Sequence, residues 1–217
     1  MERAHSVSGG AAVTIHQYKP EVINLLFDKF FTRQISVLKR YDCPKPIVRT
    51  LESKRPQVVA RAVGMIPPGS KRISFIPVIP ANRLSISEQL CMVRNGNIRG
   101  CTSLDTAFVT NLLPVPKEEY FVFSVEDGAR TLGWTPLFGE KAFRIQPNRR
   151  GLSVPETISL CLHTGVLTHH NVDAIMSKLR GKIPFMWLVE REPRLCADKV
   201  DASDPRRGIP SCNTMVI

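Results

Sequence analysis

Apolar positions along the chain follow two periods, one typical of helices and one typical of strands. From Pro20 to Tyr41 they recur three or four residues apart, which predicts a long amphipathic helix. Its expected buried face consists of Ile23, Leu26, Phe27, Phe30, Leu38 and Tyr41. Pro44 ends this helix because proline lacks the backbone N–H that a helix interior needs. A second helical stretch, broken at Pro56, is expected to run to about Ala62.

After the turn sequence "PPGSKR", runs of β-branched and aromatic residues replace the helical period. Such runs predict strands at Ile73–Pro80, Tyr120–Asp127 and Lys182–Glu190, with a final strand at Arg194–Val200. The prolines in the first run favour an edge position or a bend, since proline cannot donate to a sheet ladder.

Helices are predicted between these strands. Ser85-x-x-Glu88 and Ser153-x-x-Glu156 are capping-box sequences, in which the serine and glutamate side chains bond to each other's backbone N–H groups. The first helix is expected to stop at Asn95-Gly96 and the second, Val154–His163, near Thr164-Gly165. A further short helix is predicted at Val172–Leu179.

These elements predict an α+β fold, with a helical N-terminal segment followed by a small mixed β-sheet flanked by helices. Residues 1–19 are expected to form a flexible tail, and residues 20–217 one α+β domain. Within that domain, residues 20–64 form the helical basic segment and residues 70–217 the strand–helix portion.

The chain has no apolar run near the roughly 18 residues that a bilayer-spanning helix requires. Its first residues lack the apolar centre of a secretory signal, so we expect a cytoplasmic protein with no membrane partner. The six cysteines are scattered and form no Cys-x-x-Cys pair. In a reducing compartment we expect them to be small buried hydrophobic residues rather than disulfide partners or metal ligands.

Net charge is the unusual bulk property, at +11 for 217 residues. Residues 1–110 carry sixteen basic and seven acidic side chains, a net +9, whereas residues 111–217 carry fourteen and twelve, a net +2. An N-terminal half this basic attracts phosphate-bearing partners at long range. The alternative is that the charge serves solubility alone.

Lys29, Arg33 and Arg40 fall on one stripe of the first predicted helix, apart from its apolar face, with Ser36 between them. They are the candidate anion-binding residues of this segment. The other interpretation of such a stripe is the ordinary solvated face of an amphipathic helix.

The stretch Arg149–Asp173 holds three of the five histidines and one cysteine. On the predicted helix, Glu156, Ser159 and His163 share the face opposite Val154 and Ile158, an arrangement of base, nucleophile and orienting group. Three residues along one straight helix are too spread for a triad, so we favour a capped helix with polar residues on its solvent side. Adjacent histidines point in different directions, so no metal site is expected.

Asp127 and Arg130 follow the end of a predicted strand, and Gly128 between them would let the backbone approach a ligand closely. Asp127 is a candidate acid and Arg130 a candidate anion-binding group. The alternative is an ordinary Asp-Gly turn.

Common catalytic motifs are absent: the chain has no G-x-x-x-x-G-K-S/T, G-x-G-x-x-G, H-E-x-x-H or G-x-S-x-G sequence. We therefore expect no cofactor and favour a non-enzymatic binding or regulatory protein whose basic surface meets nucleic acid or another anionic partner. Two alternatives stay open. One is a small-molecule-binding protein or enzyme at Asp127 and Arg130, with Glu156 and His163 as further catalytic candidates, and the other is a subunit that docks on an acidic protein.

Four segments, "FFTRQISVLKRYDCP", "YFVFSVEDGARTL", "RRGLSVPETISLCLHTG" and "IPFMWLVEREPRL…GIPSC", together resemble a bacterial protein family of unknown function over roughly Val22 to Cys212. The positions that fit its pattern are Asp127, Gly128, Thr131, Leu132, Arg150, Glu156, His163, Pro184, Trp187, Pro193 and Cys212. The chain departs from it at "CADKVDASDPRR", where the family is rich in Trp and Gly. The resemblance implies a bacterial-type, cytoplasmic, single-domain α+β protein, and no activity.

Overall fold

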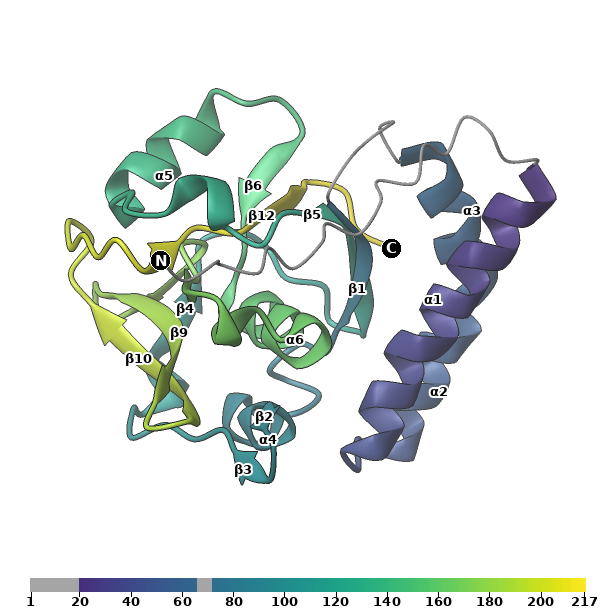
Figure 1. Cartoon of the computed structure of the whole chain (residues 1–217), viewed down its shortest axis with the longest axis horizontal. Coiled ribbons are helices and arrows are strands. Elements are labelled where there is room, and N and C mark those ends of the chain that lie inside the picture. The colour runs from purple at the N-terminus through teal and green to yellow at the C-terminus, as the bar shows by residue number, and fades with distance from the viewer. Residues whose placement is uncertain (1–19, 66–71) are drawn as a thin grey trace, which may run out of the picture.

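The computed structural model describes residues 20–65 and 72–217, which fold into an α+β structure (Figure 1). The helices of these residues are α1 (Pro20–Arg40), α2 (Lys45–Ser53), α3 (Arg55–Met65), α4 (Ile86–Met92), α5 (Pro136–Arg144) and α6 (Val154–Thr164). The expected N-terminal tail, residues 1–19, lies outside the described residues.

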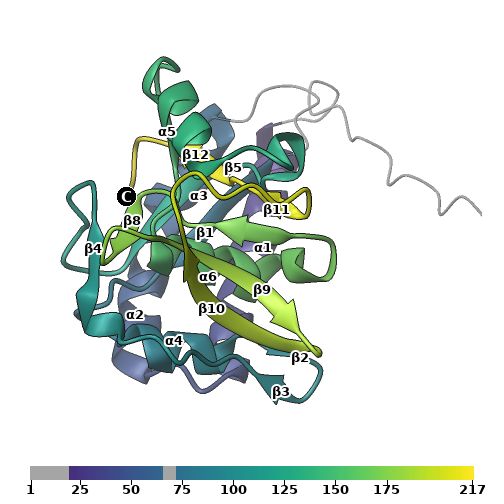
Figure 2. The same cartoon turned by 90° about the vertical axis from the view of Figure 1, so that its left-hand side faces the viewer.

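The strands are short and form several small sheets instead of one. They are β1 (Ile73–Val78), β2 (Arg94–Asn95), β3 (Ile98–Arg99), β4 (Val109–Asn111), β5 (Tyr120–Val125), β6 (Arg149–Gly151), β7 (Asn171–Asp173), β8 (Ser177–Leu179), β9 (Ile183–Val189), β10 (Glu192–Asp198), β11 (Arg207–Gly208) and β12 (Ser211–Asn213). The largest sheet has the order β10-β9-β7-β11, and it is mixed because β11 runs parallel to β7 while the other pairs are antiparallel. Its β9–β10 hairpin faces the viewer in Figure 2.

The antiparallel pair β1–β5 lies at the centre of the molecule and is buried on both faces. Phe75, Phe121 and Phe123 point to the helical layer α1–α3, whereas Ile76 and Val122 point to the opposite side. This division follows from the period of two in a strand, which sends successive side chains to opposite faces. As the prolines predicted, β1 is an edge strand, which pairs with β5 in a two-stranded sheet.

The helical layer packs along one side of β1 and β5 (Figure 1). Its buried positions are Phe27, Phe31, Ile35 and Leu38 of α1, Ile47, Val48 and Leu51 of α2, and Val58 and Ala62 of α3. The predicted apolar face of α1 was therefore partly wrong: Leu26 is 47% exposed, and the buried stripe passes through Phe31 and Ile35 instead. Asp42 adopts a left-handed conformation (φ 59°) that reverses the chain between α1 and α2.

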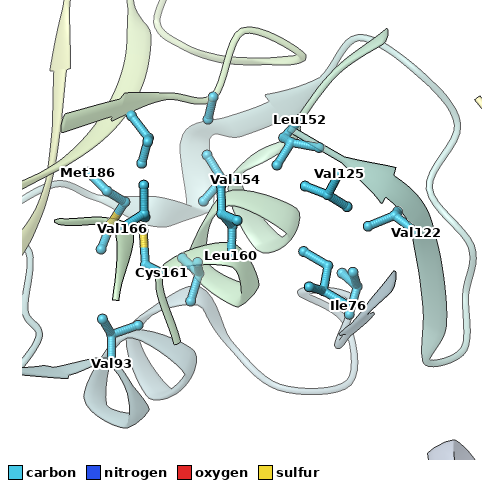
Figure 3. Packing of buried hydrophobic residues seen from close by; sticks show 14 of the residues in the cluster. Ile76, Val93, Val122, Val125, Leu152, Val154, Leu160, Cys161, Val166 and Met186 are labelled. Atoms are coloured by element: carbon cyan, nitrogen blue, oxygen red, sulfur yellow. The ribbon is translucent and has the colours of Figure 1, made fainter. Parts of the chain in front are cut away.

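On the other side of β1–β5, α6 lies at the centre of the second apolar cluster (Figure 3). Val154, Leu160 and Cys161 of this helix are surrounded by side chains from β1, β5 and β9 and from Val93. Every residue from Val154 to Cys161 is buried, so the expected solvent face of this helix does not exist over these residues.

Two further predictions are corrected. Residues 172–179 form strands β7 and β8 around a short connection instead of a helix, because they pair with β9, β11 and β4. The helix after Ser85 ends at Met92, whereas Asn95 is the last residue of β2 and Gly96 begins the turn of the β2–β3 hairpin. Helix α5 and the short strands β4 and β6 were not predicted from the sequence.

Candidate functional site

The predicted basic stripe lies on the outer face of α1. Lys29, Arg33 and Arg40 are all exposed, on the side of the helix opposite the buried Phe27 and Phe31. None of the three cations forms an ion pair with another described residue. Their charges are thus directed at solvent and are not compensated locally.

Two of the four acidic side chains of residues 20–65 form ion pairs within the helical layer. Asp28 Oδ2 lies 2.5 Å from Arg55 Nη2, and Glu52 Oε1 lies 2.6 Å from Lys39 Nζ. The Arg55 hydrogen bond lowers the pKa of Asp28. Residues 20–65 carry nine basic and four acidic side chains, so these two ion pairs leave the excess of +5 unchanged.

Further basic side chains lie on α2, near the C-terminal end of α1. Lys45 and Arg49 are exposed, and together with Lys39 they line a shallow cavity of about 610 Å³. Asp42 and Glu52 line it as well, so the cavity itself has mixed charge. The stripe on α1 is the more uniformly basic part of the helical layer.

The Asp127-Gly128 turn follows the end of β5 and contacts the C-terminal segment. Asp127 Oδ1 accepts a hydrogen bond from the Ala129 N–H (2.9 Å), and the Thr131 hydroxyl donates to the Gly128 carbonyl (2.8 Å). The same hydroxyl accepts a bond from the backbone N–H of Ile209 (2.7 Å).

Gly128 has a φ of 99°. It faces Gly208, and a Cβ added to Gly208 would lie 2.3 Å from the carbonyl oxygen of Gly128. Asp127 and Arg130 are both exposed. These contacts give Asp127, Gly128 and Thr131 a role in holding the backbone of this turn. They add no support for a ligand or catalytic site there.

Glu156 is the most elaborately bonded of the candidate residues, and it is only 2% exposed. Arg150 Nη1 and Nη2 donate to its two carboxylate oxygens, at 2.7 and 2.6 Å. The Tyr120 hydroxyl donates to Oε1 (3.0 Å), and the backbone N–H of Ser153 donates to Oε2 (2.8 Å). The last bond is the glutamate half of the predicted capping box.

These four donors determine the ionisation of the cluster. Burial acts to raise the pKa of Glu156, but the hydrogen bonds and charge of Arg150 outweigh it and lower the pKa. Burial and the neighbouring Glu156 raise the pKa of Tyr120. Glu156 is therefore an ionised carboxylate whose lone pairs are occupied, which makes it a structural anchor and a poor general base.

Ser159 and His163 do not join Glu156 in a catalytic arrangement. The Ser159 hydroxyl donates to the Pro77 carbonyl of β1. Both ring nitrogens of His163 are enclosed and have no hydrogen-bond partner among the described residues. Burial lowers the pKa of His163 to about 3, so its imidazole is neutral near pH 7 and is shielded from a substrate.

No group of three or more His, Cys, Asp or Glu side chains in the described part of the chain is arranged to hold a metal ion. All six cysteines are free thiols. Cys43, Cys161 and Cys212 are buried as expected, but Cys91 and Cys101 are exposed. Burial raises the pKa of Cys43 and of Cys212 to about 12, which makes both thiols unreactive near neutral pH.

Sequence reasoning missed the buried charges that surround the C-terminal strands. Arg207 is 3% exposed, lies 4.1 Å from the centre of the Phe185 ring, and donates to Asp173 Oδ1 through Nε (2.9 Å) and Nη2 (2.6 Å). Tyr120 was likewise treated only as a strand residue. No local pattern marks these partners, because each belongs to a segment far from the other in sequence.

Comparison with known proteins yields no match: no protein-family model, curated protein or solved structure is significantly similar to this chain. The resemblance to a bacterial family therefore stays a prediction. Among the described residues, no helix is both long enough and apolar enough to span a bilayer.

Proposed function

We propose that this protein is a non-enzymatic, cytoplasmic binding or regulatory protein that holds a nucleic-acid backbone against the outer face of α1. The observation that carries the proposal is the exposed row of Lys29, Arg33 and Arg40, which has no ion-pair partner among the described residues. Cations left unpaired on a rigid helix can displace the counterions of a phosphate backbone without first breaking an internal salt bridge.

The spacing of the row supports an extended anionic partner. At 1.5 Å per helical residue, Lys29 and Arg33 are about 6 Å apart along the axis, and Lys29 and Arg40 about 16 Å. A duplex carries one phosphate charge per about 1.7 Å of its axis, so a row of this length can meet several phosphates. Lys45 and Arg49 of α2 add two exposed cations near the C-terminal end of α1.

The whole-chain charge acts in the same direction. The net charge is +11 for the whole chain and +5 for residues 20–65, so phosphate polymers are attracted at long range and the helical layer is a basic part of the surface that they meet. Binding through phosphates alone would be insensitive to base sequence.

The test is fluorescence anisotropy of labelled RNA, single-stranded DNA and duplex DNA, titrated with the protein between 50 and 200 mM salt. We expect affinity to fall steeply with salt, since each neutralised phosphate contributes about 0.9 to the slope of log K against log salt on duplex DNA. The variant Lys29→Glu/Arg33→Glu/Arg40→Glu should bind at least about tenfold more weakly and with a smaller slope.

A matched control separates the row from net charge. Lys141, Lys182 and Lys199 are exposed and lie outside the helical layer, and their replacement by Glu changes the net charge by the same amount. If both triple variants weaken binding equally, the row on α1 is not the interface. If no nucleic acid binds at 50 mM salt but polyglutamate does, the partner is an acidic protein and the nucleic-acid proposal is wrong.

A further inference from the structure

A cavity of about 550 Å³ opens beside the Arg150–Glu156 cluster, on the other side of the molecule's central β1–β5 pair from the helical layer. Its wall is mostly apolar, formed by Leu113, Pro114, Val115, Pro116, Met176 and Val216. Tyr120, Arg150, Ser153 and Glu156 form its polar end. An apolar cavity of this size with a few convergent polar groups has the general form of a small-molecule site.

The polar end offers hydrogen-bond donors, and its one carboxylate is already occupied. Both carboxylate oxygens of Glu156 are occupied by Arg150, Tyr120 and Ser153. The Arg150 guanidinium has five N–H groups. The two of Nη1 donate to Glu156 and to the Gly151 carbonyl, and one of the two on Nη2 donates to Glu156.

The Nε–H and the second Nη2–H of Arg150 therefore have no partner among the described residues. The Arg150 side chain is 12% exposed and lines the cavity. These two N–H groups form one edge of the guanidinium, with the spacing that a carboxylate accepts in bidentate fashion.

A second cavity of about 540 Å³ adjoins the first and shares Leu113, Arg150, Met176 and Thr214 with it. Arg144, Arg149 and Glu140 line this second cavity. Each of these arginines has a carboxylate partner: Arg144 pairs with Glu140, Arg150 pairs with Glu156, and Arg149 Nη2 lies 3.5 Å from Glu126 Oε2. The preference for an anionic ligand therefore rests on the two N–H groups of Arg150 that lack a partner in the described part of the chain.

From this geometry we infer that the paired cavities bind a small monocarboxylic acid with an apolar body. The Nε–Nη2 edge of Arg150 holds the carboxylate, and the wall formed by Leu113, Val115, Met176 and Val216 holds the hydrocarbon part. This site is independent of the proposed nucleic-acid surface, because no residue of α1–α3 lines either cavity.

The experiment is isothermal titration calorimetry of the full chain with octanoate and with octan-1-ol, which has the same number of carbons but no charge. Octanoate should bind saturably at one site. Octan-1-ol should bind at least about tenfold more weakly, because it cannot accept two charge-assisted hydrogen bonds from Arg150. Arg150→Lys should reduce octanoate affinity by a similar factor, with circular dichroism used to verify that the variant is folded.

Two tryptophan variants locate the site without disturbing the core. Leu113 lines both cavities and is 42% exposed, and Leu137 lines neither and is also 42% exposed. Leu113→Trp should abolish octanoate binding by filling the cavity mouth, and Leu137→Trp should preserve it. The triple glutamate variant of α1 should bind octanoate normally, so failure of one proposal is distinguishable from failure of the other.

Three results would overturn the inference. They are the absence of saturable octanoate binding, equal affinity for octan-1-ol, and octanoate binding that survives Leu113→Trp.

Discussion

At the scale of single residues, the polar side chains of α6 differ in how far their hydrogen bonds are satisfied. Glu156 accepts four hydrogen bonds, and Ser159 donates one to β1. The ring nitrogens of His163 are enclosed without a partner among the described residues. A buried imidazole that lacks a partner remains neutral, because nothing offsets the loss of hydration of its charged form.

His163 should make the stability of the protein depend on pH. Its folded pKa of about 3 lies below the unfolded value of about 6.5, so the unfolded chain takes up the proton first as pH falls. The stabilising contribution is complete above pH 6.5 and is lost between about pH 6.5 and pH 3. From pH 7 to pH 5 this loss amounts to about 2 kcal/mol of unfolding free energy.

Urea denaturation of the wild type and of His163→Leu at both pH values measures this contribution. The wild type should lose about 2 kcal/mol more than the variant between pH 7 and pH 5. An identical loss in the two proteins would mean that His163 takes up a proton in the folded state as readily as in the unfolded chain.

At the scale of secondary-structure elements, the Arg150–Glu156 pair fastens β6 to the start of α6, and Tyr120 adds β5 to the same cluster. Both charges are almost fully enclosed, with side-chain exposures of 12% and 2%. Burying such a charge pair costs desolvation energy, and removing one partner leaves the other charge buried alone. Removing one partner therefore lowers the stability of the protein more than replacing both.

We expect Glu156→Gln to lower the unfolding free energy by about 3–5 kcal/mol, since it leaves the Arg150 charge enclosed without a counter-charge. The double variant Arg150→Met/Glu156→Gln should recover part of that loss. Urea denaturation of the wild type, Glu156→Gln, Arg150→Met and the double variant forms a double-mutant cycle. Strictly additive losses would show that the two side chains are not energetically coupled.

At the scale of the whole molecule, β1 and β5 separate two apolar clusters and belong to both. The phenylalanines of one face pack on α1–α3, and Ile76 and Val122 of the other face pack around α6. Leu162 also contacts both clusters. Loss of either cluster exposes one face of the same two strands, so the helical layer and the strand–helix portion should unfold together.

Phe75→Ala tests this coupling, because Phe75 is fully buried against α1 and contacts Phe31, Phe121 and Phe123. We expect a loss of about 3–5 kcal/mol. Circular dichroism reports the helices, including α1–α3, whereas Trp134 and Trp187 fluorescence reports the portion outside the helical layer. The two transitions should coincide in the wild type and the variant.

Ile145→Ala is the matched control, since Ile145 is 83% exposed and its truncation should change stability by no more than about 0.5 kcal/mol. If the helical signal is lost at a lower urea concentration than the tryptophan signal, α1–α3 is instead a separately unfolding unit.

The sequence alone was sufficient where a pattern reports a local property. The helical period placed α1, the β-branched runs placed β1, β5 and β9, and the separation of Lys29, Arg33 and Arg40 from the apolar positions correctly predicted their exposure. Helical and strand periods arise from backbone geometry within one segment, so they need no knowledge of the rest of the chain.

Only the tertiary structure decided what surrounds each segment. Residues 172–179 became strands because β9, β11 and β4 supply backbone partners. Residues Val154–Cys161 of α6 have no solvent face because neighbouring elements pack around them. Glu156 likewise became an ionised anchor because Tyr120 and Arg150 reach it from β5 and β6. Burial and pairing depend on contacts between distant parts of the chain, which a local pattern does not contain.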